Sequence, residues 1–318
     1  MERTVLGDTG LSVSRIALGT SALGGMYRAA DEDEGIKTVL SAFDAGINFF
    51  DTAPAYGNTA AEQVLGRALR QLPRLETVIC TKVGKLTDSD GRDSFDYSPG
   101  GIRDSFERSC QRLGVESVDI LLLHDFDAAA ADTDRALGEG LATLHELKRE
   151  GRVRAVGAGM YDMALWKRVL VGSEIDVALV HNRHTLVDNR IFELLPLIEQ
   201  LGVGLICAAP FGSGLLSGQP LPAWHPAPAS VRSRVAEAAA LIEASGSSLP
   251  ALALQFATGE PRVPVTLFSC VDRDELRRNL AWCGQAADMR LVAAAQALME
   301  PAMNATWPFG AGQEDGSA

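Results

Sequence analysis

Four residues whose side chains can move protons stand at or just after the ends of apolar runs. "INFFD" ends on Asp51, "TVICTK" on Lys82 and "DILLLH" on His124, and Tyr56 lies five positions after Asp51. A free tyrosine has a pKa of about 10, so its phenol is a useful acid and base near neutral pH only if a cation stabilises the phenolate. Lys82 can supply that charge, Asp51 can keep the lysine ionised, and His124 can orient a substrate oxygen. The set predicts proton transfer between an alcohol and a carbonyl, and because it moves no hydride, it implies a nicotinamide cofactor.

Each of these residues also has a structural interpretation. Asp51 could cap the following loop or helix, Lys82 could be an exposed strand-end charge, and His124 with Asp125 could form an ordinary polar turn. Any one of them alone would more often be structural. Their occurrence after successive strands, with Tyr56 within reach, favours the catalytic interpretation.

The elements that must position these residues are short apolar runs that alternate with amphipathic helical stretches. The runs are rich in leucine and β-branched residues and apolar on both faces, as buried parallel strands are. We count eight of them, at 15–21, 47–53, 77–83, 119–125, 153–159, 176–182, 202–210 and 263–270. Eight such units over this length predict a (β/α)8 TIM barrel, with an N-terminal β-hairpin around "GDTG" and extra C-terminal helices.

A doubly wound α/β sheet is the competing fold, and it usually carries a glycine-rich dinucleotide turn. "GAGMYD" places Asp162 where the third glycine of that turn belongs, which favours the barrel. No linker divides the chain, so we expect a single domain over 1–308 and a disordered tail over 309–318. The polar connection 85–100 is either a solvated loop or an active-site cover, and the same alternatives stay open for 216–230.

The overall charge and the cysteines limit the partners and the compartment. The chain has 318 residues, 47% of them hydrophobic, and a formal net charge of -12, which argues against nucleic acid or an anionic membrane as a partner. The five cysteines lack C-x-x-C spacing and mostly lie in apolar runs, so we expect reduced core residues. No signal peptide or membrane span is visible, since no apolar run approaches the roughly 18 residues that a span needs. We therefore expect a cytoplasmic monomer or homodimer that acts on a small molecule.

The motif "HNRH" suggests metal binding through His181 and His184. At strand spacing the two imidazoles point to opposite faces, so they cannot both reach one ion without a turn. We predict no metal site.

Several segments together resemble the aldo-keto reductase family of NAD(P)-dependent oxidoreductases. "GINFFDTAPAYG", "AEQVLGRAL", "TKVGK", "SVDILLLH" and "APFGSGLLSG" stand where the segments of that family stand, and the match covers nearly the whole chain. The resemblance implies a (β/α)8 barrel. It also implies that Asp51, Tyr56, Lys82 and His124 are the catalytic tetrad.

The resemblance also implies a set of cofactor contacts, some of which depart from common members. Gly159 and Met160 replace a Ser-Asn pair that holds the nicotinamide amide, and Ala208 falls where a stacking tyrosine is usual. Where members that prefer NADP place a lysine and an arginine, this chain has Ser269 and Glu275, and a glutamate there would repel a 2′-phosphate. We therefore expect NAD in preference to NADP, although a solvated helix-face charge is the competing interpretation of Glu275. The implied contacts are Gly19, Asn182, Arg183, Pro210, Phe211, Gly212, Ser213, Leu215, Ser269, Glu275 and Asn279.

"LLLHDFD" and "NRHTLVD" are similar to the sugar dehydrogenase branch of this family. That resemblance implies an NAD-dependent aldose 1-dehydrogenase of the L-fucose or L-galactose type, which takes a lactol to a lactone. A pyridoxal 4-dehydrogenase or a general aldehyde reductase stays open, as does a cofactor-binding regulatory subunit, which would be a different class. Candidate substrate contacts are Ser21, Tyr27, Asp125 and Arg183.

Overall fold

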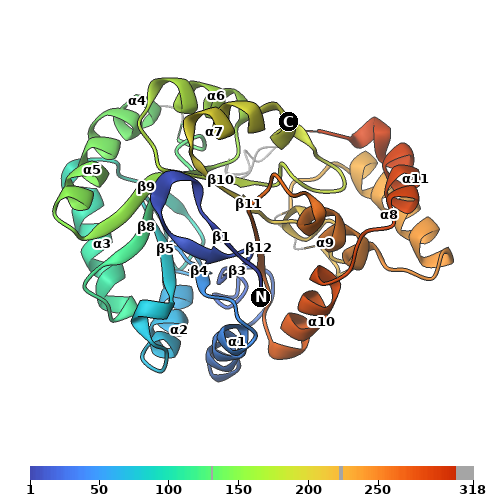
Figure 1. Ribbon diagram of the computed structural model, residues 1–318, viewed down its shortest axis with the longest axis horizontal. Helices are drawn as coiled ribbons and strands as arrows, with labels where there is room; N and C mark the ends of the chain where they lie inside the picture. The colour runs from blue at the N-terminus through green and yellow to red at the C-terminus, as the bar shows by residue number, and fades with distance from the viewer. Residues whose placement is uncertain (130–131, 222–224, 306–318) are drawn as a thin grey trace.

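The structure is a computed structural model that describes residues 1–129, 132–221 and 225–305. Eight parallel strands form a closed barrel, with hydrogen-bonded neighbours in the order β10-β11-β12-β3-β4-β5-β8-β9 (Figure 1). The predicted TIM barrel is confirmed, and each of the eight apolar runs overlaps one barrel strand. The strands are β3 (Ile16–Gly19), β4 (Phe49–Asp51), β5 (Val78–Val83), β8 (Val118–His124), β9 (Val153–Met160), β10 (Val177–His181), β11 (Gly204–Ala208) and β12 (Val265–Ser269).

Helices surround the barrel and most of them start at a capping side chain. Asp31, Ser98 and Asp162, for example, each accept a hydrogen bond from a backbone N–H in the first turn of their helix. The α-helices are α1 (Glu32–Asp44), α2 (Ala60–Leu69), α3 (Pro99–Leu113), α4 (Thr133–Arg135), α5 (Leu141–Arg149), α6 (Met163–Gly172), α7 (Leu195–Leu201), α8 (Ala229–Ala244), α9 (Leu249–Gly259), α10 (Arg273–Cys283) and α11 (Met289–Met299). The expected extra C-terminal helices are α8 and α11, which pack on each other at the side of the barrel (Figure 1).

The predicted N-terminal hairpin closes the barrel at the end where the strands begin. It pairs β1 (Arg3–Val5) with β2 (Ser12–Ser14) in antiparallel fashion. The backbone N–H of Asp8 donates to the carbonyl of Gly202, just before β11, over 2.8 Å. Leu6, Leu11 and Val13 from this segment join the buried cluster inside the barrel. The lower opening of the barrel is therefore filled with apolar side chains.

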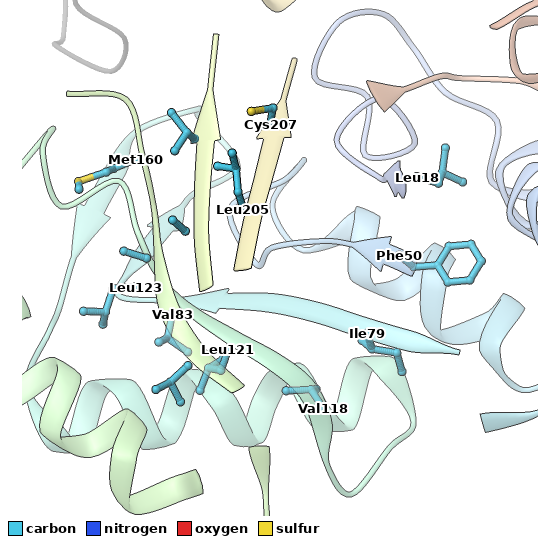
Figure 2. Close-up of a cluster of buried hydrophobic side chains, with 14 of the residues drawn as sticks. Leu18, Phe50, Ile79, Val83, Val118, Leu121, Leu123, Met160, Leu205 and Cys207 are labelled. Atoms are coloured by element: carbon cyan, nitrogen blue, oxygen red, sulfur yellow. The ribbon is translucent and has the colours of Figure 1, made fainter. Parts of the chain in front are cut away.

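A second apolar layer lies between the strands and the surrounding helices. Leu18, Phe50 and Ile79 belong to this layer, several of whose members Figure 2 shows. Every residue of β5, β8 and β11 is buried, as expected for strands covered on both faces. Each fully buried leucine or phenylalanine stabilises the fold by about 2 kcal/mol relative to an exposed one.

The connection after β5 contains structure that the sequence did not predict. Within 85–100, β6 (Lys85–Thr87) and β7 (Asp93–Phe95) form a small antiparallel hairpin.

All five cysteines are free, and four of them are buried, whereas Cys283 is partly exposed. The predicted tail, 309–318, lies outside the described residues. Among the residues that are described, no helix has the length and apolarity to cross a membrane.

Candidate active site

The strand-end residues singled out by the sequence lie on three neighbouring strands. β4 pairs with β5 and β5 pairs with β8, so Asp51, Lys82 and His124 are presented at the same, carboxyl end of the barrel. This is the end at which TIM-barrel enzymes carry their active sites. The predicted adjacency of these strands is confirmed.

Lys82 and Asp51 form a buried ion pair. The Lys82 ammonium lies 2.7 and 2.9 Å from the two carboxylate oxygens of Asp51 and donates to the carbonyl of Thr52 over 2.8 Å. Both side chains are almost inaccessible to water. Burial lowers the pKa of Lys82, but Asp51, with smaller contributions from Tyr56 and Cys80, raises it by more in total, so the net shift is upward. The lysine is therefore charged at neutral pH, as the sequence argument required.

Tyr56 lies above this ion pair, close to His124. The Lys82 nitrogen is 4.7 Å from the centroid of the Tyr56 ring, and the His124 ring meets it edge-on at 5.7 Å. Burial raises the pKa of Tyr56, and although Lys82 opposes this shift, burial prevails. Lys82 lowers the pKa of the phenol, as expected from the sequence, but the net pKa of Tyr56 lies above its ordinary value, because the cost of desolvating a phenolate outweighs the attraction of one cation that Asp51 already pairs.

The loop that carries Tyr56 is fixed by close backbone contact. Gly57 has a φ of +61°, and a Cβ built on it would lie 1.8 Å from the carbonyl oxygen of Gly24. Only glycine lets the two loops approach in this way. The phenol is thus held by packing of the loop after β4 against the loop after β3.

His124 is held through its backbone and is neutral. The Tyr97 hydroxyl donates to the His124 carbonyl over 2.8 Å. Burial, assisted by Lys82 and Lys85, lowers the pKa of His124 well below its ordinary value. Among the described residues its Nδ1 has no hydrogen-bond partner. A buried N–H without an acceptor is costly, so the proton belongs on Nε2, which can donate to a substrate oxygen.

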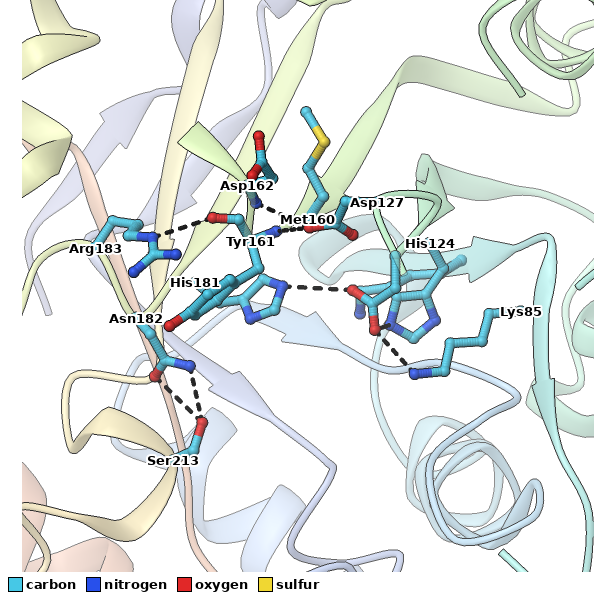
Figure 3. Close-up of polar contacts among 12 residues, drawn as sticks. Lys85, His124, Asp127, Met160, Tyr161, Asp162, His181, Asn182, Arg183 and Ser213 are labelled. Carbon is cyan, nitrogen blue, oxygen red and sulfur yellow. Dashed lines mark hydrogen bonds and ion pairs between the residues drawn. The ribbon is translucent and has the colours of Figure 1, made fainter. Parts of the chain in front are cut away.

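The mouth of the barrel contains a second polar group that sequence reasoning found only in part. The Asp125 carboxylate lies 3.0 Å from the Lys85 ammonium, 3.4 Å from His181 Nε2 and 3.6 Å from His124 Nε2 (Figure 3). Asp125 was predicted as a substrate contact, but Lys85 and His181 were not. The signal for His181 was available, because it is the last residue of its strand, as His124 is of β8.

The two histidines of "HNRH" lie apart. His181 faces Asp125, whereas the buried ring of His184 packs against Phe192 and Phe256. Among the residues that the structure covers, no three His, Cys, Asp or Glu side chains gather as a metal site would require.

Arg183 is buried and paired within the protein. Its guanidinium is buried, donates to Asp188 over 2.7 Å and lies 3.5 Å from the centroid of the Tyr161 ring. Its Nε donates to the Tyr161 carbonyl (Figure 3). Because its charge is already paired with Asp188, Arg183 braces this loop, and its predicted contacts with cofactor and substrate stay predictions.

Asn182 and Ser213 join two loops at the mouth. The Asn182 side-chain amide donates to the Ser213 hydroxyl over 2.9 Å. The segment around Ser213 turns sharply, and Ser213 itself has a φ of +56°, a left-handed conformation that side chains rarely adopt outside functional or tight turns. The other predicted contacts in this segment, Pro210, Phe211, Gly212 and Leu215, lie in the same turn after β11.

The residues predicted to hold the adenosine end lie at the end of β12 and on α10, opposite the loop after β3. The Ser269 hydroxyl accepts from the N–H of Ala22 and donates to the carbonyl of Gly19, so it joins the two loops. Glu275 accepts from the N–H of Val271 and lies 3.4 Å from Arg28, a neighbour that the sequence did not indicate.

Ser21 and Tyr27 lie in the loop after β3. The two side chains hydrogen-bond to each other, and Tyr27 remains 36% exposed. Their predicted contact with substrate stays a prediction.

Comparison with known proteins supplies the family. The sequence profile described as the Aldo/keto reductase family matches residues 15–297. The chain belongs to the aldo-keto reductase family. Among similar proteins, it is 33% identical to an L-galactose dehydrogenase from Arabidopsis thaliana over 98% of each chain. It is 30% identical to a pyridoxal 4-dehydrogenase from Microbacterium luteolum, over 89% of this chain and 93% of the other. A solved aldo-keto reductase from Bacillus halodurans in its holo form matches with a TM-score of 0.77 and 25% identity, over 98% of this chain and 99% of that one.

As an aldo-keto reductase the chain is an oxidoreductase that uses a nicotinamide cofactor. One orphaned group fits the adenine end of such a cofactor. Asn279 on α10 is buried, and its amide nitrogen has no hydrogen-bond partner among the described residues. A buried donor of this kind is costly unless a ligand acceptor satisfies it. At the proposed nicotinamide end, Gly159 and Met160 are the last two residues of β9, and the Met160 carbonyl accepts from the Trp166 ring.

Proposed function

We propose that this aldo-keto reductase is an NAD-preferring aldose 1-dehydrogenase that oxidises a cyclic aldose to its lactone. The observation that carries the proposal is the gathering of Tyr56, His124 and the Lys82–Asp51 ion pair at one end of the barrel. The similarity to a dehydrogenase named for L-galactose supports a sugar as the substrate. The five free cysteines favour a reducing compartment such as the cytoplasm.

In this proposal His124 and Tyr56 divide the work on the reacting oxygen. The neutral imidazole of His124 donates from Nε2 and orients the anomeric oxygen. Tyr56 in its phenolate form accepts the hydroxyl proton, with Lys82 close enough to stabilise the negative charge. The bound nicotinamide supplies the hydride acceptor for the hydrogen on the anomeric carbon. Tyr56 later returns its proton to solvent. Because burial raises the pKa of Tyr56, we expect the oxidation rate to increase with pH.

The preference for NAD rests on Glu275. A carboxylate at this place repels the 2′-phosphate of NADP and can accept a hydrogen bond from a ribose hydroxyl. We expect kcat/KM to favour NAD over NADP by at least tenfold.

The similarity to a pyridoxal 4-dehydrogenase makes pyridoxal the second candidate substrate.

Initial rates with a panel of aldoses, pyridoxal and simple aldehydes, each with both cofactors, test the proposal. L-Galactose or L-fucose should give NADH faster than the other compounds. Turnover of pyridoxal alone would replace the sugar with the second candidate.

For the mechanism, we expect Tyr56→Phe to lose about a hundredfold or more in kcat, because the proton carrier is gone. NAD affinity, measured by calorimetry, should stay within about threefold. Near wild-type turnover by Tyr56→Phe would refute the proton-transfer role.

A further inference from the structure

Lys85, Asp125 and His181 form a fixed group in the mouth that the catalytic tetrad does not include. We refer to these three residues as the Asp125 clamp. They come from three separate segments: the hairpin after β5, the residue after β8 and the end of β10. The side chains of its three members are 13–22% exposed, although the Nε2 atom of His181 is itself buried.

The carboxylate of Asp125 is held in place and ionised. Asp125 has a φ of +47°, and its N–H donates to the carbonyl of Gly159 over 2.9 Å. Such a left-handed conformation costs free energy in a residue other than glycine and persists where the surroundings impose it. Although burial favours the protonated form, the Lys85 ammonium and His181 hold the pKa of Asp125 below its ordinary value. An ionised carboxylate can only accept hydrogen bonds.

The Asp125 carboxylate also has room for a further hydrogen bond. Only the Lys85 contact, at 3.0 Å, has the length of a good hydrogen bond. The distances from the Asp125 carboxylate to His181 and His124, 3.4 and 3.6 Å, are long for hydrogen bonds. The carboxylate lone pairs that face these histidines can therefore accept a further hydrogen bond. His124 Nε2 is the atom assigned to the reacting oxygen of the substrate. A hydroxyl on the next carbon therefore comes within reach of Asp125.

We propose that Asp125 determines specificity by accepting a hydrogen bond from the hydroxyl on the carbon next to the reacting one. Lys85 and His181 act as positioning residues for the Asp125 carboxylate. The site then selects neutral α-hydroxy aldehydes and their cyclic hemiacetals. The inference rests on the proposed sugar oxidation and specifies which hydroxyl of the sugar is recognised.

A simpler role for Asp125 gives a different result. If the carboxylate only orients His124, its loss lowers kcat for every substrate by the same factor. If it accepts from the neighbouring hydroxyl, its loss matters only for substrates that have this hydroxyl. The ratio of kcat/KM for L-galactose to that for 2-deoxy-L-galactose separates the two, because both sugars present the same anomeric centre.

The experiment compares this ratio in four proteins with NAD. The wild type should favour L-galactose by at least tenfold, and Asp125→Asn should reduce the preference to within about threefold of unity. Lys85→Met should reduce it in part, because the carboxylate loses its anchor. Asp93→Asn is the matched control, since it removes a carboxylate 3.0 Å from the outer side of the same lysine, and it should keep the wild-type ratio.

The outcomes distinguish the inference from the proposed function. Circular dichroism and thermal unfolding check that each variant is folded. If Asp125→Asn does not fold, Lys85→Met replaces it as the test variant. If the test variant keeps the wild-type ratio of kcat/KM for the two sugars, the inference is overturned and the proposed sugar oxidation is unaffected. A wild type that oxidises neither sugar refutes sugar oxidation itself, and the inference with it.

Discussion

At the scale of single residues, the site depends on a lysine that stays charged where burial opposes charge. The Lys82 ammonium makes three short contacts, two of them to Asp51. Asp51, with Tyr56 and Cys80, raises the pKa of Lys82 by more than burial lowers it. A buried ion pair of this kind contributes little net stability over an apolar pair, but the loss of one partner leaves the other charge uncompensated. Lys82 and Asp51 are therefore coupled in stability as well as in catalysis.

We expect Asp51→Asn to destabilise the protein by about 3–5 kcal/mol, because it leaves the Lys82 ammonium buried without a counter-charge. Lys82→Met should also destabilise it, and the double variant should be more stable than the sum of the two single losses predicts. Urea unfolding of the three variants measures this coupling. Asp274→Asn, at an exposed carboxylate on α10, is the control and should change stability by less than about 0.5 kcal/mol. Additive losses would mean that the two side chains do not depend on each other.

Residues at strand ends could be predicted from the sequence because a strand fixes where its last side chain points. Asp51, Lys82 and His124 were found in this way. The protonation of Tyr56 could not be predicted, since burial of the phenol depends on contact between two loops at Gly24 and Gly57. The cofactor and substrate roles of the other residues stay predictions.

At the scale of elements, the connections after the strands carry the features that the sequence missed. The hairpin of β6 and β7 lies in a polar segment without the apolar alternation that signals a strand. Side-chain contacts in the folded chain support it, including Thr87 with Asp93 and Lys85 with Asp125. Gly84, with a φ of +96°, lets the chain turn against the Tyr97 ring before Lys85. None of these contacts is local enough in sequence to be predicted.

The contact between the loop after β3 and α10 gives a test of cofactor preference. Glu275 lies 3.4 Å from Arg28 and 3.9 Å from Arg278, so its carboxylate neutralises the cations beside the proposed ribose site. We expect Glu275→Gln to lower the preference for NAD over NADP at least fivefold, mainly through a lower KM for NADP. Asp274→Asn, on the same helical turn, is the control and should leave the preference unchanged. An unaltered preference in Glu275→Gln would assign Glu275 to the helix surface.

At the scale of the whole molecule, the two ends of the barrel are built for different purposes. The hairpin at the lower end buries apolar side chains among the barrel residues, and the upper end concentrates ionisable ones. Burial lowers the pKa of His124, His184 and His225. A histidine that is neutral in the folded state takes up its proton more readily when the chain unfolds. Stability should therefore decrease as the pH falls below about 6.5, the pKa of a free histidine.

His184 allows this acid sensitivity to be measured apart from catalysis. Its ring packs 5.7 Å from Phe192 and 5.4 Å from Phe256, between centroids, and burial lowers its pKa to about 4. The contribution of His184 to stability is complete above pH 6.5. It decreases as the pH falls to 4, and about 3 kcal/mol is lost in all.

We expect His184→Phe to remove this part of the pH dependence, because phenylalanine fills the same aromatic site without a group to protonate. Neither ring nitrogen of His184 has a hydrogen-bond partner in the described part of the chain, so the substitution leaves no polar group unpaired. Urea unfolding at pH 7.5 and pH 4.5 measures the effect. The difference in unfolding free energy between the two pH values should be smaller in His184→Phe than in the wild type by about 2–3 kcal/mol. His145→Gln is the control and should keep the wild-type difference, because His145 is a half-buried histidine on α5 whose Nε2 lies 2.9 Å from the carbonyl of Glu174 and which is not enclosed by aromatic rings. An equal acid loss in His184→Phe and the wild type would show that the other buried groups account for it, and that His184 is protonated in the folded protein as easily as in water.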